Sequence, residues 1–206
     1  MEDNKFDRLS YALGMSMGNN FRASGVDNLD SDAFAAGVRA VFDGEKPLMT
    51  YEEAKEEIRV YFTALEEKQR AAAEAAATVN AEAGKKFLDE NAAREGVNVT
   101  ASGLQYEVLK QGEGPKPTAE DQVTVHYTGS LIDGTIFDSS IERGAPATFG
   151  VSQVIPGWVE ALQLMNEGSK WRLFIPSDLA YGTHGAGPVI GPNATLIFDV
   201  ELIKVN

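Results

Sequence analysis

The sequence predicts an α+β fold, in which an all-helical N-terminal region with a long stalk helix precedes a C-terminal antiparallel β-sheet wrapped on one short helix. Two patterns indicate this. Apolar residues recur at helical spacing through the first half, whereas from Glu95-Gly96 onward they alternate with polar residues, as in half-buried antiparallel strands. Asp133-Gly134, between two apolar runs, adds a hairpin signal for which we expect positive φ at both turn positions.

Two short amphipathic helices are predicted at the start of the chain. The first carries an apolar stripe formed by Leu9, Leu13, Met17 and Phe21. After a turn at Gly25, either Asp30 or Ser31 can cap the second helix. Neither helix can bury much surface alone, so we expect them to need each other or a second copy of the chain. Gly14 and Gly18 either are tolerated or let another helix approach closely.

The third helix is predicted to be the longest. Thr50 and Glu53 form a capping box, and no proline follows until well beyond Arg94. About 43 helical residues would span roughly 64 Å. The apolar stripe fades after Leu65, and the segment becomes rich in Ala, Glu and Lys. We therefore expect a solvated spacer rather than a coiled coil.

The second half reads as a sheet with one covering helix. The helical stretch runs from Trp158 to Met165, and strands are predicted at residues 104–108, 123–128, 170–175 and 196–202. The chain is therefore expected to comprise a helical dimerisation domain, a long stalk helix and a sheet domain, at residues 1–50, 51–97 and 98–206.

Composition excludes several classes of function. The net charge is −13, and both halves are acidic, so nucleic acid and anionic membrane surfaces are poor partners. The chain has no cysteine, which excludes thiol catalysis, disulfides and cysteine-ligated metals. No apolar stretch approaches the ~20 residues of a membrane span, and no signal peptide is visible. We expect a cytoplasmic protein that does not insert into membranes; a periplasmic one whose signal peptide was removed would look the same.

The sequence offers little conventional catalytic machinery. His126 and His184 are the only histidines, and neither belongs to a hydrolase motif or a metal-ligand cluster. The glycine-rich segment 182–191 lacks the following helix that a phosphate loop needs. We therefore expect no metal and no cofactor. Several apolar residues near turns, each of which alone could be plain core, could together with Asp138 line an apolar pocket: Tyr127, Phe137, Val154, Ile155, Trp158, Tyr181 and Phe198.

Five segments of the second half resemble FKBP-type peptidyl-prolyl cis/trans isomerases. They occur in the family's order over roughly residues 100–206 and are Val125–Gly129 (VHYTG), Phe137–Ser140 (FDSS), Val154–Trp158 (VIPGW), Ala180–Gly182 and Ala194–Leu202. The helical first half is similar, in architecture more than in any fixed motif, to the dimerisation domain and stalk of the bacterial macrophage infectivity potentiator group.

The resemblance implies an isomerase of X–Pro bonds that needs no cofactor and acts on proline-containing peptides and on unfolded or folding proteins. It implies catalytic roles for Tyr127, Asp138 and Tyr181. The substrate-binding residues that it implies are Phe137, Arg143, Phe149, Val154, Ile155, Trp158, Ile190 and Phe198. Among these, Trp158 would form the floor of the pocket and Arg143 would pair with Asp138.

The resemblance also implies partners. Macrolides of the rapamycin type would be inhibitors, and a V-shaped homodimer with chaperone activity is expected. Three departures from the family pattern bear on substrate preference and macrolide affinity: Ala147, Ala186 and Gly191-Pro192. Two alternatives stay open. One is a holdase or adaptor that binds clients through an FKBP-like pocket without catalysis, and the other is a scaffold whose main role is dimerisation.

Overall fold

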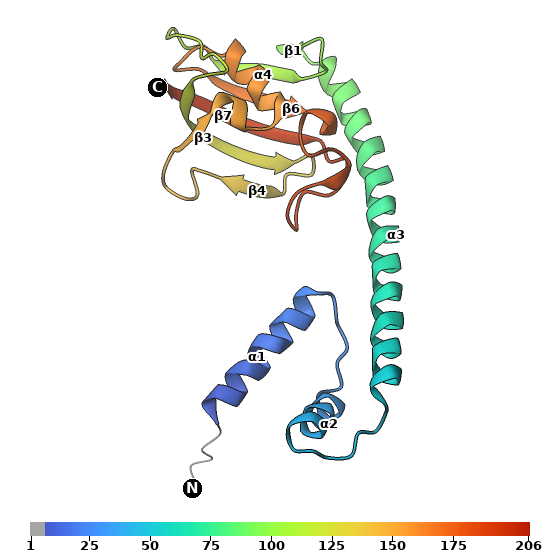
Figure 1. Ribbon diagram of the computed structural model, residues 1–206. Helices are drawn as coiled ribbons and strands as arrows, with labels where there is room; N and C mark the ends of the chain where they lie inside the picture. The colour runs from blue at the N-terminus through green and yellow to red at the C-terminus, as the bar shows by residue number, and fades with distance from the viewer. Residues whose placement is uncertain (1–6) are drawn as a thin grey trace, which may run out of the picture. The chain divides into compact units, whose positions relative to one another are not determined.

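The computed structural model describes residues 7–206 (Figure 1). The chain divides into two compact units, Met1–Gln69 and Arg70–Asn206. The three main helices of the first half are α1 (Arg8–Ala23), α2 (Ser31–Phe42) and α3 (Tyr51–Ala92). Since α3 begins in the first unit and ends in the second, the boundary between the units lies within one helix.

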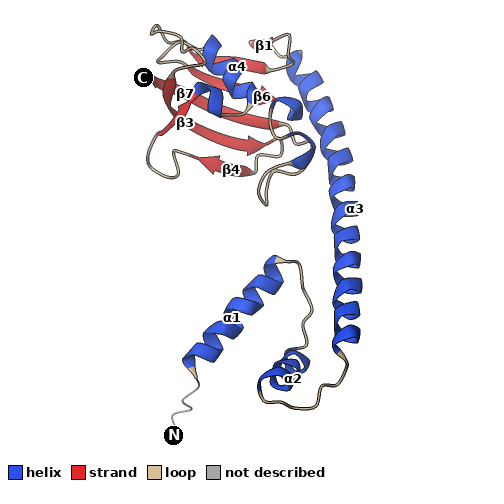
Figure 2. Ribbon diagram, viewed as in Figure 1, coloured by secondary structure: helices blue, strands red, loops and turns tan. Residues whose placement is uncertain are grey.

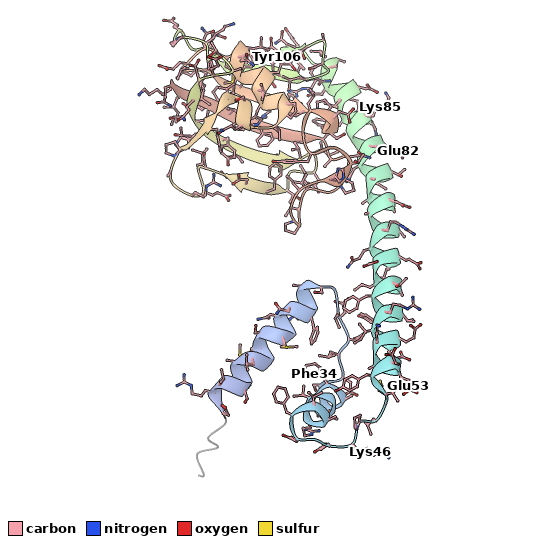
Figure 3. The ribbon with its side chains drawn as sticks, in the orientation of Figure 1. Phe34, Lys46, Glu53, Glu82, Lys85 and Tyr106 are labelled. Atoms are coloured by element: carbon pink, nitrogen blue, oxygen red, sulfur yellow. The ribbon has the colours of Figure 1, made fainter. Side chains whose placement is uncertain are left out.

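The first unit holds α1, α2 and the start of α3, and side chains cap each helix at its beginning. Asp30, rather than Ser31, caps α2 by accepting from the N–H groups of Asp32 and Ala33. At α3, whose first turn contains Glu53 (labelled in Figure 3), the Thr50 N–H donates to Glu53 Oε2 at 2.7 Å and the Glu53 N–H donates to Thr50 Oγ1 at 3.2 Å. These bonds confirm the predicted capping box.

The apolar stripes of α1 and α2 stay largely uncovered within one chain. Phe21 of α1 and Phe34 of α2 meet edge to face with ring centroids 5.6 Å apart. No residue of either helix is buried in the part of the chain that the structure describes. Large side chains of both stripes are exposed, including Leu9, Leu13, Val41 and Phe42.

The second unit contains the last turns of α3, and these turns pack on the sheet domain. Half-buried and buried residues recur along one stripe of the helix: Ala76, Ala77, Asn80, Gly84, Phe87, Leu88 and Asn91. Asn91 Nδ2 donates to Gln105 Oε1 at 2.8 Å, and Gln105 Nε2 donates to the Leu88 carbonyl at 2.9 Å. The expected solvated spacer is therefore wrong for residues 76–91, because the surface that covers them comes from the distant half of the chain.

Seven strands form one antiparallel sheet in the order β1-β2-β6-β7-β3-β4, with β5 paired to β3 (Figure 2). The strands are β1 (Val97–Val99), β2 (Gln105–Lys110), β3 (Gln122–Leu131), β4 (Ile136–Ser139), β5 (Ala147–Gly150), β6 (Lys170–Ile175) and β7 (Leu196–Val205). Along β3, burial alternates as the sequence predicts, and Val123, Val125 and Tyr127 face the core.

One helix, α4 (Pro156–Leu164), covers the apolar face of the sheet (Figure 2). Pro156 occupies the first turn, where its missing N–H has no cost. Trp158, Ala161 and Leu162 are buried in a core that also contains Val125 and other inward side chains of β3, β6 and β7. This arrangement is the predicted α+β sheet wrapped on one short helix.

The hairpin between β3 and β4 differs from its prediction in turn type. The Gly134 N–H donates to the Leu131 carbonyl at 3.0 Å, and the Leu131 N–H donates to the Thr135 carbonyl at 2.9 Å. Gly134 has φ +89°, but Asp133 is not in the left-handed region. The expectation of two positive φ values was wrong, because a longer loop places only its glycine in that region. Asp133 instead accepts from the Thr135 N–H at 2.9 Å.

None of the helices within residues 7–206 combines the length and the apolar character that crossing a bilayer requires.

Candidate active site

A cavity of about 720 Å³ opens beside the first turn of α4. It is lined by Tyr127, Phe137, Asp138, Phe149, Gln153, Val154, Ile155, Trp158, Tyr181, Ala186, Gly187, Pro188, Val189, Ile190 and Phe198. Ten of the eleven site residues named from the sequence are in this set. The eleventh, Arg143, contacts the carboxylate of Asp138.

An aromatic cluster surrounds Trp158, which is 4% exposed. The Trp158 ring meets Tyr127, Phe149 and Phe198 edge to face, with centroids 5.3, 6.0 and 5.2 Å apart. Edge-to-face packing places the positive edge of one ring against the negative face of another, and so holds each ring in one orientation. The floor of the cavity is therefore rigid and apolar.

Phe137 joins this cluster across strand β3 because of one glycine. The Phe137 and Phe198 rings meet edge to face with centroids 5.5 Å apart. They lie directly over Gly129, where a Cβ atom would come within 2.6 Å of both rings. Any larger residue at Gly129 would displace the two rings, so this glycine is needed for the shape of the cavity wall.

Three polar side chains form a closed network at the rim. The Tyr127 hydroxyl donates to Asp138 Oδ2, and Arg143 Nη1 pairs with Asp138 Oδ1. Arg143 Nη2 also donates to the Tyr127 hydroxyl oxygen at 2.9 Å. The guanidinium lies over the Tyr127 ring, 5.5 Å from its centroid, in cation–π geometry. This network confirms the predicted pairing of Arg143 with Asp138.

The network holds Asp138 ionised and Tyr127 neutral. Burial works to raise the pKa of the Asp138 carboxyl, but the hydrogen bonds from Tyr127 and Arg143 outweigh it and leave that pKa below its usual range. The pKa of Tyr127 is raised, first by burial and then by its hydrogen bond to Asp138, against the opposing effect of Arg143. At neutral pH the cavity therefore presents a fixed carboxylate and a phenol.

The indole N–H of Trp158 is buried at the cavity without a hydrogen-bond partner within residues 7–206. Two further donors there also lack a partner in this range: the N–H of Ile155, which is the N-cap residue of α4, and the hydroxyl of Tyr181. Tyr181 is 39% exposed and therefore accessible to a ligand. An extended peptide has carbonyls at regular intervals, so these two groups can hold it at two points.

A loop between β6 and β7 supplies three lining residues that the sequence did not single out: Gly187, Pro188 and Val189. The Ala186 N–H donates to the Ile190 carbonyl at 2.8 Å, and the Ile190 N–H donates to the Ala186 carbonyl at 3.2 Å. These two bonds form a tight hairpin with Gly187, Pro188 and Val189 at its tip. The glycine-rich composition of this segment predicts an ordered loop, but only the fold brings it to the cavity. Gln153 was also not predicted, and no local pattern distinguishes it.

Two other residues considered from the sequence lie outside the cavity. Ala147, on β5, packs against the core, while Phe149 from the same strand lines the cavity. His126 bonds Ser140 Oγ through Nδ1 at 3.0 Å, and the same hydroxyl accepts from the Tyr127 N–H at 2.8 Å. His126 thus has a structural role, and no group of acidic or histidine side chains suited to a metal ion occurs within residues 7–206.

Comparison with known proteins covers nearly the whole chain. Residues 114–203 match the family model "FKBP-type peptidyl-prolyl cis-trans isomerase", and residues 6–108 match "Domain amino terminal to FKBP-type peptidyl-prolyl isomerase". The chain is similar to the probable FKBP-type isomerase FkpA of Neisseria meningitidis serogroup B, at 50% identity over 201 residues that cover 95% of this chain and 73% of the relative.

Two further comparisons agree with these matches. The outer membrane protein MIP of Legionella longbeachae is 47% identical over 199 residues, which cover 97% of this chain and 85% of the relative. The crystal structure of FkpA from Escherichia coli superposes with a TM-score of 0.72 at 37% identity, covering 99% of this chain and 98% of that one.

Proposed function

Since this chain belongs to the FKBP-type peptidyl-prolyl cis-trans isomerases and is such an isomerase, we propose that the cavity beside α4 is its active site. The observation that carries the proposal is the aromatic floor around Trp158 together with a single charged lining residue, Asp138, whose charge is already paired. We assign catalytic roles to Tyr127, Asp138 and Tyr181. We assign substrate binding to the other residues that the family resemblance implied: Phe137, Arg143, Phe149, Val154, Ile155, Trp158, Ile190 and Phe198.

The cavity would accelerate rotation by favouring the twisted amide. Rotation about an X–Pro bond has a barrier of about 18–20 kcal/mol, because amide resonance must be broken. The twisted bond is less polar than the planar bond, since the nitrogen lone pair no longer delocalises onto the carbonyl oxygen. An apolar enclosure built from Trp158, Phe198 and Phe137 therefore binds the twisted form better than the planar form, which is transition-state stabilisation without a covalent step.

The polar groups would hold the peptide while its central bond turns. The Ile155 N–H and the Tyr181 hydroxyl are free to donate to substrate carbonyls on either side of the proline. Asp138 is fixed by Tyr127 and Arg143, so it meets the rotating carbonyl as an oriented carboxylate that need not reorganise during the reaction. No proton transfer is needed, which agrees with the structural role of His126.

Among the alternatives, a holdase or adaptor would need the apolar floor but not the polar rim. Here the rim formed by Tyr127, Asp138 and Arg143 is intact and fully bonded, and Tyr181 reaches the cavity. These features favour catalysis over binding alone. We also propose that macrolides of the rapamycin type occupy the same cavity and compete with peptides.

We further propose that the chain acts as a homodimer on unfolded and folding proteins. The exposed stripes of α1 and α2, with Phe42 84% exposed, are the surface that a second copy would cover. Two linked pockets bind one client more tightly than either pocket alone, because the second contact occurs at a high effective concentration.

The compartment expected from the sequence was the cytoplasm, with the periplasm as the alternative. The Legionella longbeachae relative is named an outer membrane protein, which favours the alternative, so we propose a periplasmic location. Selective release of periplasmic contents from the source cells would carry the protein into the released fraction, and retention with cytosolic markers would refute this location.

Fluorescence of Trp158 gives a direct test of ligand binding at the cavity. The chain has two tryptophans. The other, Trp171, stacks on Tyr106 with ring centroids 4.3 Å apart and does not line the cavity. The variant Trp171→Phe therefore leaves an emission that reports on the cavity alone. We expect this emission to shift and saturate when rapamycin or a short X–Pro peptide is added.

The matched control is Trp158→Phe, in which only the distant tryptophan emits. Its emission should not respond to either ligand. A saturable response in this control, combined with none in Trp171→Phe, would place ligand binding outside the proposed site.

A further inference from the structure

The loop between β6 and β7 reaches from the cavity wall to α3. Its hairpin, closed by Ala186 and Ile190, places Ile190 at the cavity, where this residue is 8% exposed. Two residues further on, Pro192 and Asn193 lie against α3. The Asn193 N–H also donates to the Gly182 carbonyl at 2.8 Å and so closes the base of the loop.

Two side-chain amides join this loop to the helix. Asn80 Nδ2, on α3, donates to the Pro192 carbonyl at 2.8 Å in a half-buried position. Asn193 Nδ2 donates in return to the Ala77 carbonyl at 3.3 Å. Asn193 has φ +56°, and no other non-glycine residue in the described part of the chain lies in the left-handed region. The loop thus adopts an uncommon conformation where it meets the helix.

Two glycines allow the loop between β6 and β7 to approach α3 closely. A Cβ atom at Gly191 would lie 3.0 Å from Asn80 Nδ2, so a larger residue there would press on the amide. On the helix, a Cβ atom at Gly84 would collide with the side chain of Thr195, just before β7. The departure Gly191-Pro192 therefore has a physical reason, because glycine leaves room for the Asn80 amide.

We propose that Asn80 is a positioning residue for isomerisation: by holding the Pro192 carbonyl, it fixes the loop that places Val189 and Ile190 at the cavity wall. This inference rests on the proposed active site. Asn80 itself does not line the cavity, so it acts through the loop. Because the loop forms the wall and not the aromatic floor, its displacement should weaken the binding of peptide and macrolide more than it slows the rotation of bound substrate.

The test compares full-length Asn80→Ala and Asn80→Asp with wild type. Both variants remove the donor, and the aspartate keeps the size of the side chain. We expect the KM for a short X–Pro peptide and the Kd for rapamycin to rise about three- to tenfold, the range expected for one lost hydrogen bond, while kcat stays within about twofold. The matched control is Glu82→Ala, an exposed position on the same helix (Figure 3), which should match wild type.

A double-mutant cycle with Gly191→Ala tests the link between the helix and the loop. Alone, Gly191→Ala should also raise KM and Kd, because its methyl group displaces the Asn80 amide. Combined with Asn80→Ala, it should add little, because the amide is already absent.

The possible outcomes separate the two proposals. An active wild type with unchanged KM and Kd in both Asn80 variants would overturn this inference alone. A lowered melting temperature with unchanged KM and Kd in the folded fraction would also overturn it, since Asn80 would then be merely structural. A wild type that neither binds nor turns over peptide would overturn the proposed active site and this inference with it.

Discussion

Asp138 is the one charged side chain that lines the cavity, and its ionisation sets the expected pH dependence. Its pKa is depressed below the usual value for Asp, about 3.9. A carboxylate with a depressed pKa is fully ionised above the usual pKa of Asp. Its charge is lost only when the pH falls through the lower pKa of the folded state. We therefore expect kcat/KM to be flat from about pH 5 to pH 8 and to decline only below about pH 4. The measurement is a pH–rate profile with a short X–Pro peptide.

Asp138→Asn serves as the control for this profile. It keeps the shape of the side chain but removes the charge that pairs with Arg143, so we expect a lower rate without the acid limb. An inflection in the wild type between about pH 6 and pH 7, well above the usual pKa of an aspartate, would contradict the assignment of the pH dependence to Asp138.

At the same scale, the sequence named most of the side chains that line the cavity, because they lie in short contiguous motifs. Tyr127, Asp138 and Trp158 were named from segments of four or five residues, and all three line one cavity. Pro188 and Val189 were not named, since each reaches the cavity through the path of a loop, which no local pattern encodes. Gln153, the last residue of a short 3-10 helix, was not named either. Ile190, which follows Val189 in the sequence, was named only through the family resemblance.

Among the elements, α3 shows most clearly what local sequence cannot predict. Its start was predicted from the pairing of Thr50 with Glu53, which is a contact between near neighbours. Its packing on the sheet domain was missed, because Asn80 and Asn91 look like solvated residues until strands and loops from the distant half cover them. The hairpin at Gly134 was located correctly, but its turn type was not, because the loop between Leu131 and Ile136 is longer than the two residues of the motif.

Gly84 provides a stability test of this packing. In a free helix, alanine is favoured over glycine by about 1 kcal/mol, so Gly84→Ala would stabilise a solvated spacer. Here the new Cβ would collide with Thr195, so we expect a net loss of about 1–3 kcal/mol in the free energy of unfolding. Urea unfolding followed by tryptophan fluorescence measures it.

The neighbouring exposed residue Ala83 measures the effect of helix propensity alone on the free energy of unfolding. Ala83→Gly should cost about 1 kcal/mol from helix propensity alone. If Gly84→Ala proved more stable than wild type by that same amount, the helix would not pack against the loop as described.

For the whole molecule, the exposed apolar stripes of α1 and α2 lead to the expectation of a dimer. We expect sedimentation to give about twice the chain mass of 22.2 kDa. Deletion of residues 1–50 or the substitution Phe42→Glu should give a monomer that turns over short peptides at the wild-type rate. The same monomer should be slower on a refolding protein, because the second pocket is lost.

Ala72→Glu, on an exposed stretch of α3, is the matched control and should remain dimeric. Equal activity of monomer and dimer on a refolding protein would contradict the role of the dimer while leaving the isomerase site unaffected.

The most direct test of the proposed active site is the rate of cis-to-trans conversion in a short X–Pro peptide, for wild type and Asp138→Leu, with and without rapamycin. We predict a wild-type rate well above the spontaneous one and lowered by both the substitution and the drug. A fast rate that neither Asp138→Leu nor rapamycin lowers would place the chemistry elsewhere on the molecule. A rate no faster than the spontaneous one would make the cavity beside α4 a binding site without catalysis.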